Sequence, residues 1–178
     1  MRNVDSDTIV AIATAPGAAG IAIVRVSGPE ALQVADRMFH CRGQRPSQRP
    51  SHTIVHGRVC STSGETLDEA LLLIMRAPHS YTGEDVVEFQ CHGGTVSAAR
   101  ILRRATEVGC RIAEPGEFTK RAFLNGRMDL SQAEGVLALI QAGSERAADA
   151  ALRVLRGELG REVNRVYDAI LSASANLD

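Results

Sequence analysis

Two charged residues stand inside apolar runs of the sequence, and they are the first candidates for chemistry. Arg25 lies within the run 21–26, and Glu88 lies within the run 85–90, where its apolar neighbours must point to the other face of a strand. A charge in such a place needs a partner or a cleft, because an unpaired buried charge is costly. The two side chains could bind a polar ligand, or Arg25 could lie on an edge strand and reach solvent.

Further charged residues gather late in the sequence. The stretch 114–133 holds a proline–glycine pair, a short amphipathic helix, an Asn-Gly break and a new helix start. Ser131 and Glu134 have the spacing of a capping box, which predicts that the next helix begins at Ser131. The charged residues within 120–127 would then lie at a junction between two parts of the chain, where a cleft could also contain Arg25 and Glu88.

The dipeptide Cys91-His92 suggests a nucleophile or a metal ligand, but the sequence offers no second ligand or base at a useful spacing. The four cysteines are far apart and form no CxxC, so neither a zinc site nor a disulfide framework is predicted. Phosphate-binding, dinucleotide, zinc-protease and serine-hydrolase motifs are also absent. We therefore predict no catalytic residue and no metal site in this chain.

Composition narrows the class of protein. The 178 residues are 44% apolar and 23% charged, and the net charge of −1 gives no overall field toward nucleic acid or a membrane. Aromatic residues make up only 3%, which argues against a stacking platform for single-stranded RNA. The loop 40–51 carries three arginines that could touch phosphate, but a solvated loop is the favoured interpretation. No apolar run is long enough for a membrane span and no signal peptide is visible, so we predict a cytoplasmic protein.

The chain divides into a mixed part and a helical part. Strands are expected at 8–13, 21–26, 53–60, 69–75, 85–90 and 111–113, and helices at 30–39 and 95–108. This order predicts an α+β fold for residues 1–116, with helices on one face of a mainly antiparallel sheet. Residues 117–178 are expected to be all-helical. One helix runs over 131–142, and a second continues unbroken from Ser144 with an apolar stripe that needs a further helix to cover it, so we expect a longer protein.

Three stretches resemble signature blocks of the MnmE (TrmE) family of tRNA-modification GTPases: 7–29, 80–94 and 115–134. The resemblance implies a homodimeric protein that works with an FAD-binding partner, MnmG (GidA), on the C5 position of the wobble uridine of tRNA. Residues 1–116 would resemble the folate domain of aminomethyltransferases and bind 5-formyl- or 5,10-methylene-tetrahydrofolate. Residues 117–178 would begin a helical domain, into which the family inserts a GTPase domain that uses GTP, Mg²⁺ and K⁺. Because that insert is missing here, this chain is not expected to hydrolyse GTP.

Carried onto this sequence, the folate contacts of the family fall on Arg25, Glu88 and Arg127. A carboxylate suits the N–H donors of the pterin edge, and cationic side chains suit the glutamate tail of folate, with the division between Arg25 and Arg127 left open. Arg127 stands where the family usually has lysine, so the charge is kept and the contact geometry changes. The alternatives are a dimerising scaffold with a vestigial folate pocket that docks a partner or tRNA, and a free-standing folate enzyme inferred from fold analogy.

Overall fold

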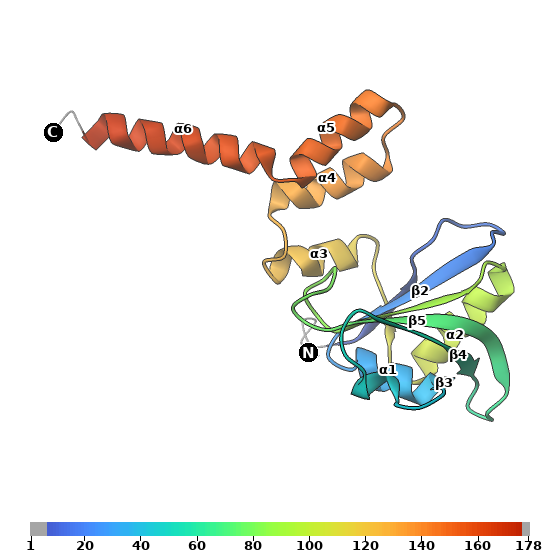
Figure 1. Ribbon diagram of the computed structural model, residues 1–178. Helices are drawn as coiled ribbons and strands as arrows, with labels where there is room; N and C mark the ends of the chain where they lie inside the picture. Colours follow the sequence, from blue (N-terminus) through green and yellow to red (C-terminus); the bar gives the residue numbers. More distant parts are fainter. Residues whose placement is uncertain (1–6, 176–178) are drawn as a thin grey trace. The chain divides into compact units, whose positions relative to one another are not determined.

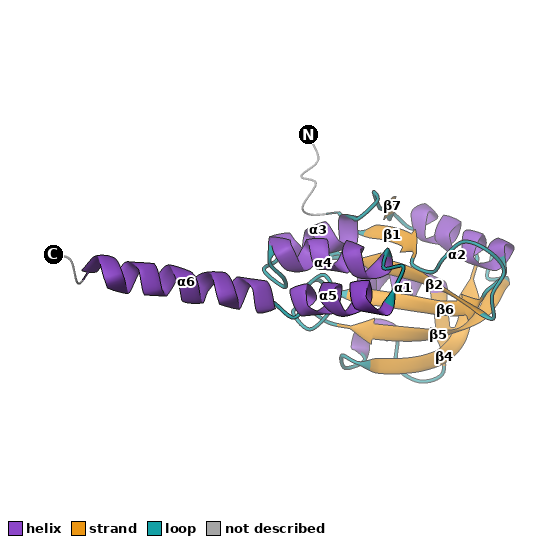
Figure 2. Ribbon diagram, turned by 90° about the horizontal axis from the view of Figure 1, so that it is seen from above, coloured by secondary structure: helices purple, strands orange, loops and turns teal. Residues whose placement is uncertain are grey.

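A computed structural model describes residues 7–175, and within them seven strands form one sheet in the order β3-β4-β5-β6-β2-β1-β7. Figure 2 shows β4, β5, β6, β2 and β1 side by side in this sheet. The strands are β1 (Ile9–Ile12), β2 (Ile21–Ser27), β3 (Phe39–Cys41), β4 (Thr53–Cys60), β5 (Thr66–Met75), β6 (Val86–His92) and β7 (Arg111–Ile112). In the described sheet β1 and β7 are parallel, and every other neighbouring pair is antiparallel.

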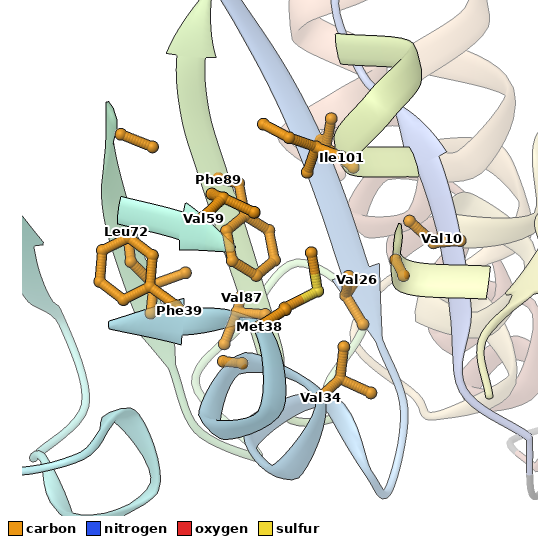
Figure 3. Packing of buried hydrophobic residues seen from close by; sticks show 14 of the residues in the cluster. Val10, Val26, Val34, Met38, Phe39, Val59, Leu72, Val87, Phe89 and Ile101 are labelled. Atoms are coloured by element: carbon orange, nitrogen blue, oxygen red, sulfur yellow. The ribbon is translucent and has the colours of Figure 1, made fainter. Parts of the chain in front are cut away.

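Two helices, α1 (Ala31–Met38) and α2 (Thr95–Glu107), pack against one face of the sheet (Figure 1). Alternate residues of the central strands point toward them, because successive side chains of a strand face opposite ways. The resulting core includes Val26 of β2, Phe89 of β6 and Met38 of α1, all fully buried (Figure 3). The predicted α+β class, with helices on one face of a mainly antiparallel sheet, is confirmed.

The stretch 40–51 was expected to be a solvated loop, and this prediction is wrong in part. It contains the end of β3 and a short 3-10 helix, η2 (Pro46–Gln48). Asp36 of α1 holds this turn, since its carboxylate accepts hydrogen bonds from the Ser47 backbone N–H at 2.9 Å and from the Ser47 hydroxyl at 2.5 Å. The composition of the stretch itself does not predict this structure, because the hydrogen bonds that hold it come from Asp36 on the preceding helix.

The chain forms two compact units, the first ending at Arg121 and the second beginning at Ala122. The sequence placed the boundary at 116/117, whereas the structure divides inside α3 (Glu117–Leu124). The second unit continues with α4 (Leu130–Ile140), α5 (Glu145–Leu155) and α6 (Glu158–Ala175). None of the helices in the described residues is long and apolar enough to cross a membrane.

Two predictions about the second unit are wrong in detail. The capping residue of α4 is Asp129 rather than Ser131: its carboxylate accepts the Gln132 backbone N–H at 2.7 Å, and the Gln132 side chain accepts the Asp129 N–H at 2.9 Å. The helix from Ser144 is not continuous, since Gly157 takes a φ of +73° between α5 and α6. Glycine readily ends a helix in this left-handed conformation. The apolar stripe continues past Gly157, so the hydrophobic pattern alone does not show that the helix ends there.

Candidate functional site

The antiparallel pairing of β2 with β6 places Arg25 directly opposite Glu88. Both side chains alternate with core residues, so they lie on the face of the sheet opposite α1 and α2. Arg25 Nε donates to Glu88 Oε1 at 2.7 Å, and the two side chains are 24% and 9% exposed. The structure therefore brings together two of the three predicted site residues. Each charge is tolerated within its apolar strand because it forms an ion pair with the other.

Two aromatic rings flank the Arg25 guanidinium. Its carbon Cζ lies 5.1 Å from the ring centroid of Tyr81 and 5.5 Å from that of Phe118, which are cation–π distances. The Tyr81 hydroxyl shares a 2.8 Å hydrogen bond with the hydroxyl of Thr119 on α3. Sequence reasoning missed both rings as site residues. The one signal in the sequence that could have pointed to them was the rarity of aromatic residues, because the chain has only two tyrosines and four phenylalanines.

Arg25 and Glu88 retain hydrogen-bonding capacity beyond their own contact. In the described part of the chain, neither Nη1 nor Nη2 of Arg25 donates a hydrogen bond, and Oε2 of Glu88 accepts none. Fully buried side-chain polar atoms there all have partners, so these open positions belong to atoms that reach solvent. The pair thus presents both donors and an acceptor, beside two aromatic rings, to a polar planar ligand.

A network of charges ties the first turns of α3 to the sheet. The buried Arg121 contacts the carboxylates of Asp7 at 2.5 Å, Glu117 at 3.0 Å and Glu84 at 3.2 Å. Arg111 of β7 adds contacts of 2.5 Å to both Asp7 and Glu117. Because α3 carries Phe118, this network also holds one of the two rings beside Arg25.

The network strongly favours the ionised carboxylates. The hydrogen bond from Arg111 is the main reason that the pKa of Glu117 falls to about 2, and it also lowers the pKa of Asp7. A backbone N–H at Glu114 and the Arg121 guanidinium stabilise the Glu117 carboxylate further. These groups satisfy one another, so their role is to position α3 rather than to react.

The residues around Cys91-His92 form a different arrangement from a nucleophilic site. His92 Nδ1 lies 2.7 Å from Asp68 Oδ1, and the Ser97 hydroxyl also donates to the Asp68 carboxylate. The Ser97 hydroxyl therefore bonds to Asp68 and not to His92. A histidine activates a serine only when the serine hydroxyl bonds to the histidine itself. Burial raises the pKa of the Cys91 thiol and keeps it protonated. Among the described residues no group of three or more His, Cys, Asp or Glu side chains is placed to hold a metal ion.

Arg127, the third predicted contact, belongs to the second unit. Its backbone N–H donates to the Ala122 carbonyl at 2.8 Å, which closes the turn after α3. The pair of Arg25 and Glu88 lies wholly in the first unit, so a shared site with Arg127 stays a prediction.

Comparisons with known proteins agree with the fold. The family described as "GTP-binding protein TrmE N-terminus" matches residues 8–127. A tRNA modification GTPase MnmE of Symbiobacterium thermophilum is 54% identical over 173 residues, which is 97% of this chain and 38% of that protein. Proteins of the same name from Shouchella clausii and Geobacillus kaustophilus are each 48% identical, over 98% and 97% of this chain. The chain spans about 38% of the length of these relatives. It belongs to the TrmE N-terminus family.

Proposed function

We propose that this chain is the folate-binding and dimerisation module of a cytoplasmic tRNA-modifying GTPase. The whole protein would act with the FAD-dependent partner MnmG on C5 of the wobble uridine. The relatives are named as tRNA modification GTPases, and that activity comes to this chain as part of the proposal. The observation that carries the folate assignment is the pairing of Arg25 with Glu88 beside Tyr81 and Phe118.

The residues present fit a tetrahydrofolate. Glu88 Oε2 is an acceptor for N–H groups of a pterin edge, and the Nη groups of Arg25 are donors for a carbonyl or carboxylate oxygen. Tyr81 and Phe118 offer apolar ring surface beside these polar atoms. The hydrogen bond between Arg25 and Glu88 fixes both side chains before a ligand arrives, which reduces the ordering entropy lost on binding. Bound tetrahydrofolate would supply the one-carbon unit.

Dimerisation is supported by the sheet face that carries Arg25. Ile21 of β2 is 61% exposed and Leu71 of β5 is 41% exposed on this face. Exposed apolar residues on one face of a sheet are typical of an interaction surface. A second copy of the chain would bury them, and this surface also supports the alternative of a dimerising scaffold with a vestigial folate pocket.

The test is a calorimetric titration of the 178-residue chain with 5-formyltetrahydrofolate, after sedimentation has established its oligomeric state. Saturable binding supports the folate module. A folded dimer that binds no folate favours the scaffold. Neither outcome requires GTP hydrolysis, which we expect of the longer protein and not of this chain.

A further inference from the structure

A second polar region of the first unit lies at the β3 edge of the sheet. An open groove of about 910 Å³ lies there, and four of its lining residues are uncharged. The rest of its lining is five basic side chains and one acid: His40, Arg42, Arg49, His56, Arg58 and Glu69. We call it the basic groove. Its three arginines outnumber the single glutamate, although the chain as a whole has a net charge of −1. The charge of this region is therefore a local property that composition does not reveal.

The strand register gathers these side chains. His40 of β3 lies opposite Arg58 of β4, and Arg58 lies opposite Glu69 of β5. His56 follows on the same face of β4, with Nε2 3.9 Å from Glu69 Oε2. Directly opposed side chains on neighbouring strands are about 5 Å apart at Cβ, so the groove carries its charges in a close row.

The arginines of the groove differ in their internal contacts. Arg49 is committed to the fold, since its guanidinium donates to the Gln44 carbonyl at 3.0 Å and to the Arg42 carbonyl at 2.7 Å. Within residues 7–175 the guanidinium groups of Arg42 and Arg58 make no hydrogen bond and no ion pair. Arg49 therefore stabilises the loop, whereas the guanidinium groups of Arg42 and Arg58 remain available to an external anion.

We propose that the basic groove binds the phosphate backbone of RNA. Guanidinium groups bind phosphate in a bidentate manner, and the two available guanidinium groups of one groove could contact more than one phosphate of a polyanion. The groove is lined by no Phe, Tyr or Trp side chain, so we expect it to contact mainly phosphate and ribose. This inference rests on the proposed function in naming RNA. The groove uses residues other than Arg25 and Glu88, although the strand register places them on the same face of the sheet.

The experiment measures the binding of a fluorescently labelled tRNA transcript to the 178-residue chain by anisotropy at several KCl concentrations. The variant Arg42→Glu/Arg58→Glu should weaken binding at least about tenfold and reduce the slope of log K against log salt by about 1–2. The matched control is Arg100→Glu/Arg103→Glu, which changes the net charge equally at two exposed positions of α2, on the other side of the sheet. The control should change affinity by less than about threefold.

Cys41 gives a second readout at the groove itself. It lines the groove and is half-buried, whereas the other three cysteines are buried. Saturating tRNA should slow the alkylation of Cys41 by iodoacetamide. Polyglutamate should neither slow alkylation nor compete for tRNA.

Four results would overturn the proposal: no tRNA binding by the wild-type chain, equal losses in both double variants, unprotected Cys41, or polyglutamate binding as tightly as tRNA. The last would assign the groove to an acidic protein. Folate titration of Arg42→Glu/Arg58→Glu separates the two proposals, because its folate affinity should equal that of the wild-type chain. Folate binding without tRNA binding overturns the groove alone, and tRNA binding without folate binding overturns the folate site alone.

Discussion

Phe118 lies with its ring centroid 5.5 Å from the guanidinium carbon of Arg25, although the two residues are far apart in the sequence. Phe118 comes from the first turn of α3, and Arg25 comes from the middle of β2. The charge network around Arg121 fixes α3 in this position. The environment of Arg25 therefore depends on α3 as well as on the sheet.

Replacing Phe118 by leucine should remove the cation–π contact and keep most of the apolar volume. We expect the free energy of unfolding to fall by about 0.5–1 kcal/mol, and the affinity for 5-formyltetrahydrofolate to fall a few-fold. Urea denaturation and calorimetry measure the two effects. Phe123→Leu, at an exposed position of the same helix, serves as the control. Equal effects in both variants would show that the contact with Arg25 is not responsible.

Arg121→Met should be strongly destabilising, because it leaves three carboxylates without their shared buried cation. Breaking a buried ion pair by removing one partner costs about 3–5 kcal/mol. Arg37→Met is the control, since Arg37 pairs with Glu30 at the surface and should contribute at most about 1 kcal/mol. Denaturant unfolding that gave the two variants the same loss would contradict the role of the network.

The network also predicts a loss of stability in acid. The pKa of Glu117 is about 2 in the folded chain, against an ordinary value of 4.5, and that of Asp7 is also lowered. A lowered carboxyl pKa contributes stability that is fully present above the unfolded value and is lost as the pH falls toward the folded value. The free energy of unfolding should therefore decrease from about pH 5 toward about pH 2, with a smaller slope in Glu117→Gln. The same slope in Glu117→Gln as in the wild-type chain would contradict this assignment.

Gly93 should be intolerant of a side chain. A Cβ at this position would lie 2.2 Å from the Ala19 carbonyl oxygen, and Gly93 exchanges backbone hydrogen bonds with Ala19 and Gly20. Gly93→Ala should cost about 1–3 kcal/mol of stability, since the backbone of the loop before β2 must move. The neighbouring Gly94→Ala meets nothing within 4 Å and should cost less than about 1 kcal/mol. Thermal unfolding that ranked the two variants in the opposite order would refute the clash.

The strands that carry the candidate site could be predicted from the sequence because each is an apolar run with one internal charge. Alternation also indicated that Glu88 points away from Val87 and Phe89. The contact between Arg25 and Glu88 could not be derived, because it depends on the register of two strands whose residues are 63 positions apart. Pairing of distant strands is fixed by the whole core and leaves no local signal.

The errors in the helical unit have local causes. Asp129 and Ser131 are both good capping residues, and the structure uses the earlier one with Gln132 as its partner. At Gly157 the apolar stripe favoured one long helix, but the chain turns there and the Gln132 side chain donates to the Leu155 carbonyl at the end of α5 at 2.8 Å. A periodic pattern predicts which residues face inward, and it does not show where one helix ends and the next begins.

The most direct test of the folate assignment compares the wild-type chain, Glu88→Gln and Glu69→Gln in calorimetric titrations with 5-formyltetrahydrofolate. Glu69 is an exposed carboxylate on the neighbouring strand β5 and controls for the loss of a negative charge. Glu88→Gln should weaken binding by about 1–3 kcal/mol, roughly 5- to 150-fold, while Glu69→Gln binds as the wild-type chain does. Unchanged folate affinity in a folded Glu88→Gln variant would contradict the assignment of Glu88 as a folate contact.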